Sequence, residues 1–143
     1  MSYVSIWVHA VWATKNREPF LLQPFRKVLF DHIKEKASEK NIYIDRINGY
    51  DEHVHCLISV QPMHSIAYVM QMLKGESSRW VTKNFEEMSH FDWADKYFAA
   101  SVSGSHVNAV RKYIENQEKH HADVSFSEEM ETIGKRYRIK PSF

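Results

Sequence analysis

The sequence is short of cysteine, of long apolar runs and of charge of one sign. Its 143 residues include a single cysteine, so an intrachain disulfide is excluded and a reducing, cytoplasmic setting is expected. It has no apolar stretch long enough for a membrane span, and its first residues have no basic leader, so we expect neither a membrane segment nor a signal peptide. Low-complexity segments and internal repeats are also missing, which leaves a globular domain as the expectation.

The formal net charge of +1 lacks the general basic excess that nucleic-acid-binding proteins usually carry. Nucleic-acid binding would therefore depend on local basic clusters, although each cluster alone is more typical of a solvated surface. The candidate contact residues are Lys15, Arg17, Lys74, Arg79, Arg111 and Lys112.

With 43% hydrophobic and 13% aromatic residues, the chain can bury a real core. Residue patterns predict strands at 3–13, 42–50, 53–60 and 96–102, with Asn48-Gly49 as turn residues. They predict helices at 24–40, 65–84 and 106–121, the last capped by Ser105. This order predicts an α+β fold, a ferredoxin-like antiparallel sheet with helices packed on one face. We expect one domain at 1–122 and, where the periodicity is lost, a C-terminal arm at 123–143.

His53 and His55 lie one residue apart in an otherwise apolar strand. Alternate side chains of a strand share a face, so the two imidazoles point the same way while Val54 and Cys56 point to the core. Two imidazoles on one rigid face form half of a metal site. No organic cofactor is indicated by any motif.

The last predicted helix places Tyr113 and Gln117 four residues apart, on one face. Val107, Val110 and Ile114 form an adjacent apolar stripe that would dock this helix on the sheet, near the histidines. A phenol, an amide oxygen and two imidazoles then converge. This set suits phosphoryl transfer, because a divalent ion can polarise a phosphate while a tyrosine oxygen attacks phosphorus.

Each feature alone has a simpler interpretation. A histidine pair is common in strands, one of seven tyrosines is usually a packing residue, and a single glutamine is usually on the surface. His120 and His121 could be ligands, but a solvated helix end is the simpler reading. Tyr137 is a rival nucleophile in the basic tail.

The sequence resembles the single-tyrosine HUH transposases of the insertion-sequence 200/605 group over residues 3–121. The family's His-hydrophobe-His motif corresponds to His53-Val54-His55, and its Tyr-x-x-x-Gln motif to Tyr113 and Gln117. Stretches at 8–17, 49–55, 73–79 and 100–104 also look like the family.

The resemblance implies that His53, His55 and Gln117 bind Mg²⁺ or Mn²⁺ and that Tyr113 attacks single-stranded DNA. The expected product is a 5′-phosphotyrosine and a free 3′-hydroxyl, which later rejoins strands. It also implies DNA hairpins near the transposon ends as partners, and a homodimer in which the tyrosine helix reaches across to the partner subunit.

Three hypotheses follow. The first is a metal-dependent single-strand DNA transposase. The second is a non-catalytic hairpin DNA- or RNA-binding protein derived from such an enzyme. The third is a metal-dependent hydrolase that uses water as the nucleophile, with Tyr113 as a structural residue.

Overall fold

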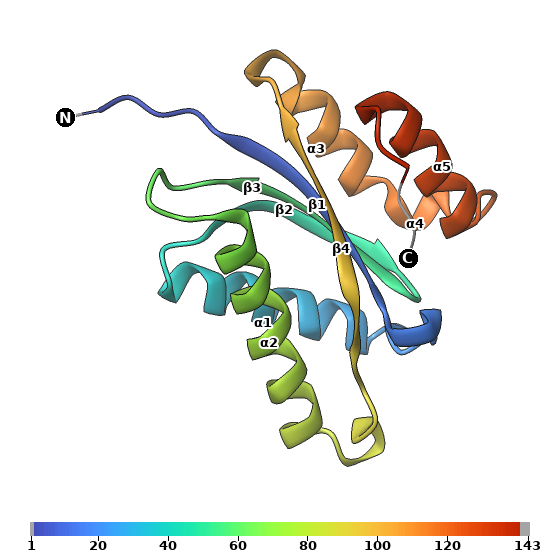
Figure 1. Ribbon diagram of the computed structural model, residues 1–143. Helices are drawn as coiled ribbons and strands as arrows, with labels where there is room; N and C mark the ends of the chain where they lie inside the picture. The colour runs from blue at the N-terminus through green and yellow to red at the C-terminus, as the bar shows by residue number, and fades with distance from the viewer. Residues whose placement is uncertain (1, 141–143) are drawn as a thin grey trace.

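Four antiparallel strands form one sheet at the centre of the computed structural model, which describes residues 2–140 (Figure 1). The strand order across the sheet is β2-β3-β1-β4. The strands are β1 Trp7–Thr14, β2 Tyr43–Tyr50, β3 His53–Ser59 and β4 Trp93–Val102. The helices are α1 Phe25–Glu39, α2 Ile66–Asn84, α3 Val107–Glu115, α4 Gln117–His120 and α5 Phe126–Tyr137, with short 3₁₀ turns η1 Lys15–Arg17, η2 Glu86–Met88 and η3 Gly104–His106.

The element order and the antiparallel pairing confirm the α+β, ferredoxin-like prediction. Helices α1 and α2 cover one face of the sheet (Figure 1). Their apolar residues pack against the side chains of β1 and β3 that point to that face, including Trp12, Val54 and Cys56. None of the helices among residues 2–140 is long and apolar enough to span a membrane.

The opposite face is covered as well, which corrects the expectation that helices pack on one face. Helices α3 and α5 lie on that side of the sheet in Figure 1. Leu57 packs with α3, and Val11 and Phe98 pack with α5. The physical reason is that β1 and β3 are apolar and buried on both faces, so a single layer of helices would leave Leu57 and Val11 in water.

The C-terminal part differs from the sequence prediction in three ways. The helix expected at 106–121 is interrupted at Asn116, which separates α3 from α4. Ser105 makes no cap, because His106 precedes α3 and has no capping side-chain bond. The segment expected as an irregular arm contains α5, whose Phe126, Met130 and Ile133 are buried.

Polar contacts also fasten α3 to strand β2. Asp45 accepts two hydrogen bonds from Arg111, with distances of 2.6 and 3.1 Å. Asn48 donates its amide to the carbonyl oxygens of Ile114 and Glu115, at 3.0 and 3.2 Å, where the helix ends. The helix that carries Tyr113 is therefore held by its own chain's sheet.

Gly49 lies inside β2 opposite Val54, and the turn of the β2-β3 hairpin is made by Asp51 and Glu52 instead of Asn48-Gly49. A Cβ atom at position 49 would overlap the backbone oxygen of His53 and lie 3.1 Å from Cα of Val54. Glycine at this position therefore sets how closely the two strands approach beside His53.

Gly49→Ala is expected to lower stability by about 1–3 kcal/mol, because the overlap is with backbone that cannot turn away. The melting temperature should fall by roughly 3–12 °C in thermal denaturation. Gly104→Ala is the matched control, since a Cβ there meets nothing within 4 Å. Equal melting temperatures for the two variants would contradict this account of the hairpin.

Candidate active site

The β2-β3 hairpin places His53 and His55 on the face covered by α3 and α5, and both side chains are fully buried. Nδ1 of His53 lies 2.6 Å from Oε1 of Glu52. Nε2 of His53 points the other way, to Oε1 of Gln117 at 3.0 Å. Its ring stacks on Phe126 of α5, which fixes the plane of the imidazole.

Gln117 is the first residue of α4 and is also fully buried. Its amide nitrogen donates to Oε2 of Glu129 at 2.8 Å, so its carbonyl oxygen is the atom turned to His53. The Tyr113 hydroxyl donates a short hydrogen bond to the same Oε2. The four residues predicted from the sequence, His53, His55, Tyr113 and Gln117, are therefore in one place.

Glu129 of α5 is the residue that joins them, and sequence reasoning missed it. Its side chain is 1% exposed. Oε1 faces three imidazole nitrogens: Nε2 of His121 at 2.9 Å, of His55 at 3.2 Å and of His53 at 3.3 Å. Three imidazoles, a carboxylate and an amide oxygen thus surround one small volume.

The protonation states follow from these contacts. Burial opposes the charge on Glu129, but hydrogen bonds from His121, His53 and His55 outweigh it and hold the pKa of this carboxyl well below its usual range. Burial alone would also lower the pKa of His53, yet hydrogen bonds to Glu129 and Glu52 raise it. His53 is thus a proton donor that faces oxygen atoms.

His9 of β1 supports His55 from behind. Its Nε2 lies 2.8 Å from Nδ1 of His55. Burial, together with its neighbour His55, lowers the pKa of His9 to about 3, and burial lowers the pKa of His55 to about 4, so both rings are neutral. With His9 as the partner on Nδ1, Nε2 of His55 carries the ring proton and donates it to Glu129, so a metal ion at Nε2 would replace that proton.

His53, His55 and Glu129 form a possible metal site, since their ligand atoms lie within 4.8 Å of one another. The donor set fits a divalent ion: imidazole nitrogens and a carboxylate are ligands that Mn²⁺ and Zn²⁺ accept. An ion bound to Nε2 of His53 would replace a proton that already faces two oxygen atoms. The nearby amide oxygen of Gln117 could complete the set.

Tyr113 lies at the edge of this cluster and lines a cavity of about 320 Å³. His9, His120, Arg136 and Tyr137 also line the cavity. Burial and the charge of Glu129 raise the pKa of Tyr113. Tyr137, the rival nucleophile, lies on α5, where burial raises its pKa too, and it makes none of the contacts with Glu129 that Tyr113 makes.

Several of the predicted basic contact residues are held by partners within the described chain. Arg17 donates to Ser127 at 3.1 Å, and Arg111 binds Asp45. The Lys74 ammonium donates to the backbone oxygens of Ala94 and Asp95, at 2.7 and 3.0 Å. Arg79, Lys112 and Lys15 are exposed, and Lys15 lies 4.0 Å from Asp92. DNA contact by these six residues remains a prediction.

The signal that could have found Glu129 lies in the sequence of α5. Ser125 and Glu128 form the capping pattern of a helix start, and Ser125 does accept the backbone N–H of Glu128 at 3.1 Å. Phe126, Met130 and Ile133 then repeat at helical spacing on the buried face. A carboxylate at 129, on the buried face of such a helix, needs a buried partner.

The same geometry corrects the reading of His121 as part of a solvated helix end. Its side chain is 2% exposed and is held between Glu129 and the backbone oxygen of Val124. His120, in contrast, keeps 32% of its side chain exposed.

Comparison with known proteins supports the identity of the fold and of the family. The sequence model of the family described as "Transposase IS200 like" matches residues 2–117. The ISDra2 transposase TnpA of Deinococcus radiodurans is 25% identical over 114 residues, which cover 76% of this chain and 81% of that protein. The transposase of insertion sequence element IS200 of Salmonella typhimurium is 25% identical over 114 residues, covering 76% of this chain and 74% of that protein.

Two solved structures agree. A crystal structure of a candidate transposase from Deinococcus radiodurans R1 superposes with a TM-score of 0.67 at 28% identity, covering 82% of this chain and 95% of that one. A REP-associated tyrosine transposase bound to a REP hairpin shares the fold, with a TM-score of 0.64 at 14% identity over 87% of this chain and 73% of that one. With a family match that spans most of its length, this chain belongs to the IS200-like transposases.

Proposed function

We propose that this transposase cleaves and rejoins single-stranded DNA through a 5′-phosphotyrosine on Tyr113, with a divalent ion held by His53, His55 and Gln117. The observation that carries the proposal is the convergence of these four side chains, from two separate parts of the chain, within the contacts of one carboxylate. The fold relative bound to a REP hairpin supports hairpin DNA as the partner.

The chemistry needs a nucleophile, an electrophile and a leaving group. The Tyr113 oxygen attacks phosphorus, the bond from phosphorus to the 3′-oxygen breaks, and the products are a 5′-phosphotyrosine and a 3′-hydroxyl. Attack by such a hydroxyl on a second phosphotyrosine reverses the step and rejoins strands, so no external energy source is consumed.

The residues of the site divide this work. Glu129 fixes the position of the Tyr113 oxygen through its hydrogen bond, and His9 and Glu52 orient the two histidine rings. Because burial and the charge of Glu129 raise the pKa of Tyr113, the phenol needs positive charge nearby. A divalent ion at the histidines supplies that charge and polarises the phosphate, and Mg²⁺ or Mn²⁺ would serve.

Tyr113→Phe is expected to abolish covalent attachment to DNA, because only the attacking hydroxyl is lost, while fold and hairpin binding remain. The measurement is a denaturing gel of the protein incubated with labelled single-stranded DNA from the flanks of its own gene and Mg²⁺. Tyr43→Phe is the matched control, since that side chain is 54% exposed.

An undiminished adduct in Tyr113→Phe would transfer the role to another tyrosine, with Tyr137 tested next. Hairpin binding without an adduct in the wild-type protein would favour the non-catalytic binding protein. Cleavage that persists in Tyr113→Phe without any adduct would favour the hydrolase that uses water.

His53→Ala and His55→Ala are each expected to abolish metal-dependent cleavage. Their loss of metal affinity should exceed the roughly 10- to 100-fold loss typical of changing an outer-shell partner. DNA affinity should change little, because it comes mainly from phosphate contacts. Cleavage rate against Mn²⁺ concentration and a DNA-binding titration measure the two effects, with the exposed His90→Ala as control. Normal cleavage by both variants would refute the metal assignment.

We also propose a homodimer, because joining two strand ends requires two tyrosines and because β2 and β4 are sheet edges that a second copy can pair. The sequence resemblance favours a tyrosine helix that reaches across to the partner subunit. The contacts of Arg111 and Asn48 with β2 support the opposite arrangement, in which each chain completes its own site.

Mixing Tyr113→Phe protein with His53→Ala protein separates these arrangements. With sites completed within one chain, no mixed dimer has an intact site and cleavage stays absent. Restored cleavage after subunit exchange would show that the helix works across the interface. Sedimentation as a monomer, with and without DNA, would remove the dimer itself.

A further inference from the structure

A second group of metal-ligand side chains adjoins the site on the side of Tyr113. His120 and His121, at the end of α4, lie with Glu129 so that one ligand atom from each falls within 4.8 Å of the others. Nε2 of His121 is 2.9 Å from Oε1 of Glu129, and Nε2 of His120 is 3.8 Å from Oε2. Glu129 therefore belongs to both groups, and its two oxygen atoms face different histidines.

His121 is prepared as a ligand by its other nitrogen. Its Nδ1 lies 2.6 Å from the backbone oxygen of Val124, an acceptor only, so Nδ1 carries a proton, and Nε2 faces the Glu129 carboxylate, where a cation would take the place of the proton in that hydrogen bond. A ring N–H held by a backbone carbonyl is the usual support of a metal-bound histidine. At 2% exposure, the His121 side chain is fixed in this orientation by the packing around it.

His120 contributes a nitrogen that nothing else uses. Its Nε2 atom is buried and has no hydrogen-bond partner among the described residues. The ring lies 5.6 Å from that of Tyr113, centroid to centroid, and lines the same cavity as Tyr113 and Arg136. A buried ring nitrogen without a partner costs free energy, which a bound cation would recover.

We propose that His120, His121 and Glu129 bind a second divalent cation, with the Glu129 carboxylate as the bridge to the ion at His53, His55 and Gln117. Two ions joined by a carboxylate are a recurrent arrangement in enzymes that transfer phosphoryl groups. Two imidazoles and a carboxylate select Mn²⁺ or Zn²⁺ over Mg²⁺. The bridging role rests on the proposed function, but the second site's own ligands do not depend on it.

The site also has space for the remaining ligands of such an ion. The cavity of about 320 Å³ beside His120 can hold several water molecules or a phosphate group. Oε2 of Glu129 accepts the hydrogen bond of Tyr113, so an ion on this side would lie near the oxygen that attacks phosphorus.

The test is the number of ions bound per chain. The protein, stripped with a chelator, is titrated with Mn²⁺ by calorimetry, and the bound metal is counted by elemental analysis after gel filtration. Wild type should bind two ions, and electron paramagnetic resonance should show a spin-coupled Mn²⁺ pair. His120→Ala should bind one, with the spectrum of an isolated ion.

His53→Ala provides the complementary measurement, because it removes the first site and should leave the second. Loss of both ions in that variant would overturn the independence of the second site, while loss of neither would count against the proposed function alone. His121→Asn is a second variant of the proposed site, and thermal melting of both variants detects a folding defect. Because His120 is partly exposed, His120→Ala should keep the melting temperature of the wild type.

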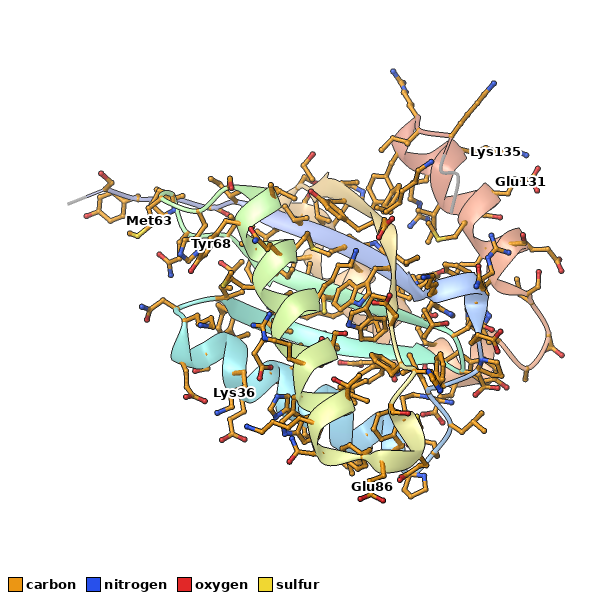
Figure 2. All side chains as sticks on the ribbon, turned by 60° about the horizontal axis from the view of Figure 1, so that its bottom comes forward. Lys36, Met63, Tyr68, Glu86, Glu131 and Lys135 are labelled. Carbon is orange, nitrogen blue, oxygen red and sulfur yellow. The ribbon has the colours of Figure 1, made fainter. Side chains whose placement is uncertain are left out.

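Glu131→Gln is the control on the same helix. Its side chain is 74% exposed, and Figure 2 shows Glu131 and Lys135 on the outer side of α5, away from the sheet. It should bind two ions like the wild type. A single ion in the wild-type protein, or two ions in both His120→Ala and His121→Asn, would overturn the proposal.

Discussion

The ionised carboxylate of Glu129, almost fully buried, is the charge around which the second face of the sheet is organised. An unpaired charge at that depth would cost several kcal/mol. Here it is surrounded by donors from three elements and the residue that follows the last of them: the imidazole of His55 in β3, the phenol of Tyr113 in α3, the amide of Gln117 in α4 and the imidazole of His121 just after α4. Contacts with this one anion thus hold the β2-β3 hairpin and helices α3, α4 and α5 in fixed positions relative to one another.

The sheet serves two different purposes on its two faces. Toward α1 and α2 it presents an apolar layer that includes Trp12 and Cys56, and this layer supplies most of the core. Toward α3 and α5 the same strands present His9, His53 and His55 among apolar residues. Core side chains and site side chains therefore alternate along β1 and β3. A shift of the strand register by one residue would turn both sets to the wrong face of the sheet.

Much of this arrangement could be read from the sequence, because it follows from local periodicity. The strand of His53 and His55 and the spacing of Tyr113 and Gln117 fixed which side chains share a face. Two features could not be read in this way. The break at Asn116 lies inside a continuous helical pattern, and the partner of Glu129 is set by tertiary contact between α5 and a hairpin more than 70 residues earlier.

The helical pattern of α5 itself was available, in the capping pattern of Ser125 and Glu128 together with the apolar spacing of Phe126, Met130 and Ile133. It is short, and acidic and basic residues on its exposed side dilute the signal. His121 is a similar case, since a histidine at a helix end is usually solvated, and only the carbonyl of Val124 and the Glu129 carboxylate make it a buried residue.

The family match ends at residue 117, whereas His120, His121 and Glu129 follow it. The site therefore has two parts: one inside the family match, with the histidine strand, Tyr113 and Gln117, and one beyond it, with the anion that faces them. Substitutions in this second part would change the available metal ligands, the charge next to Tyr113 and the cavity that Tyr113 lines. Selection could thus alter an individual transposase through α5 without changing any residue of the family match.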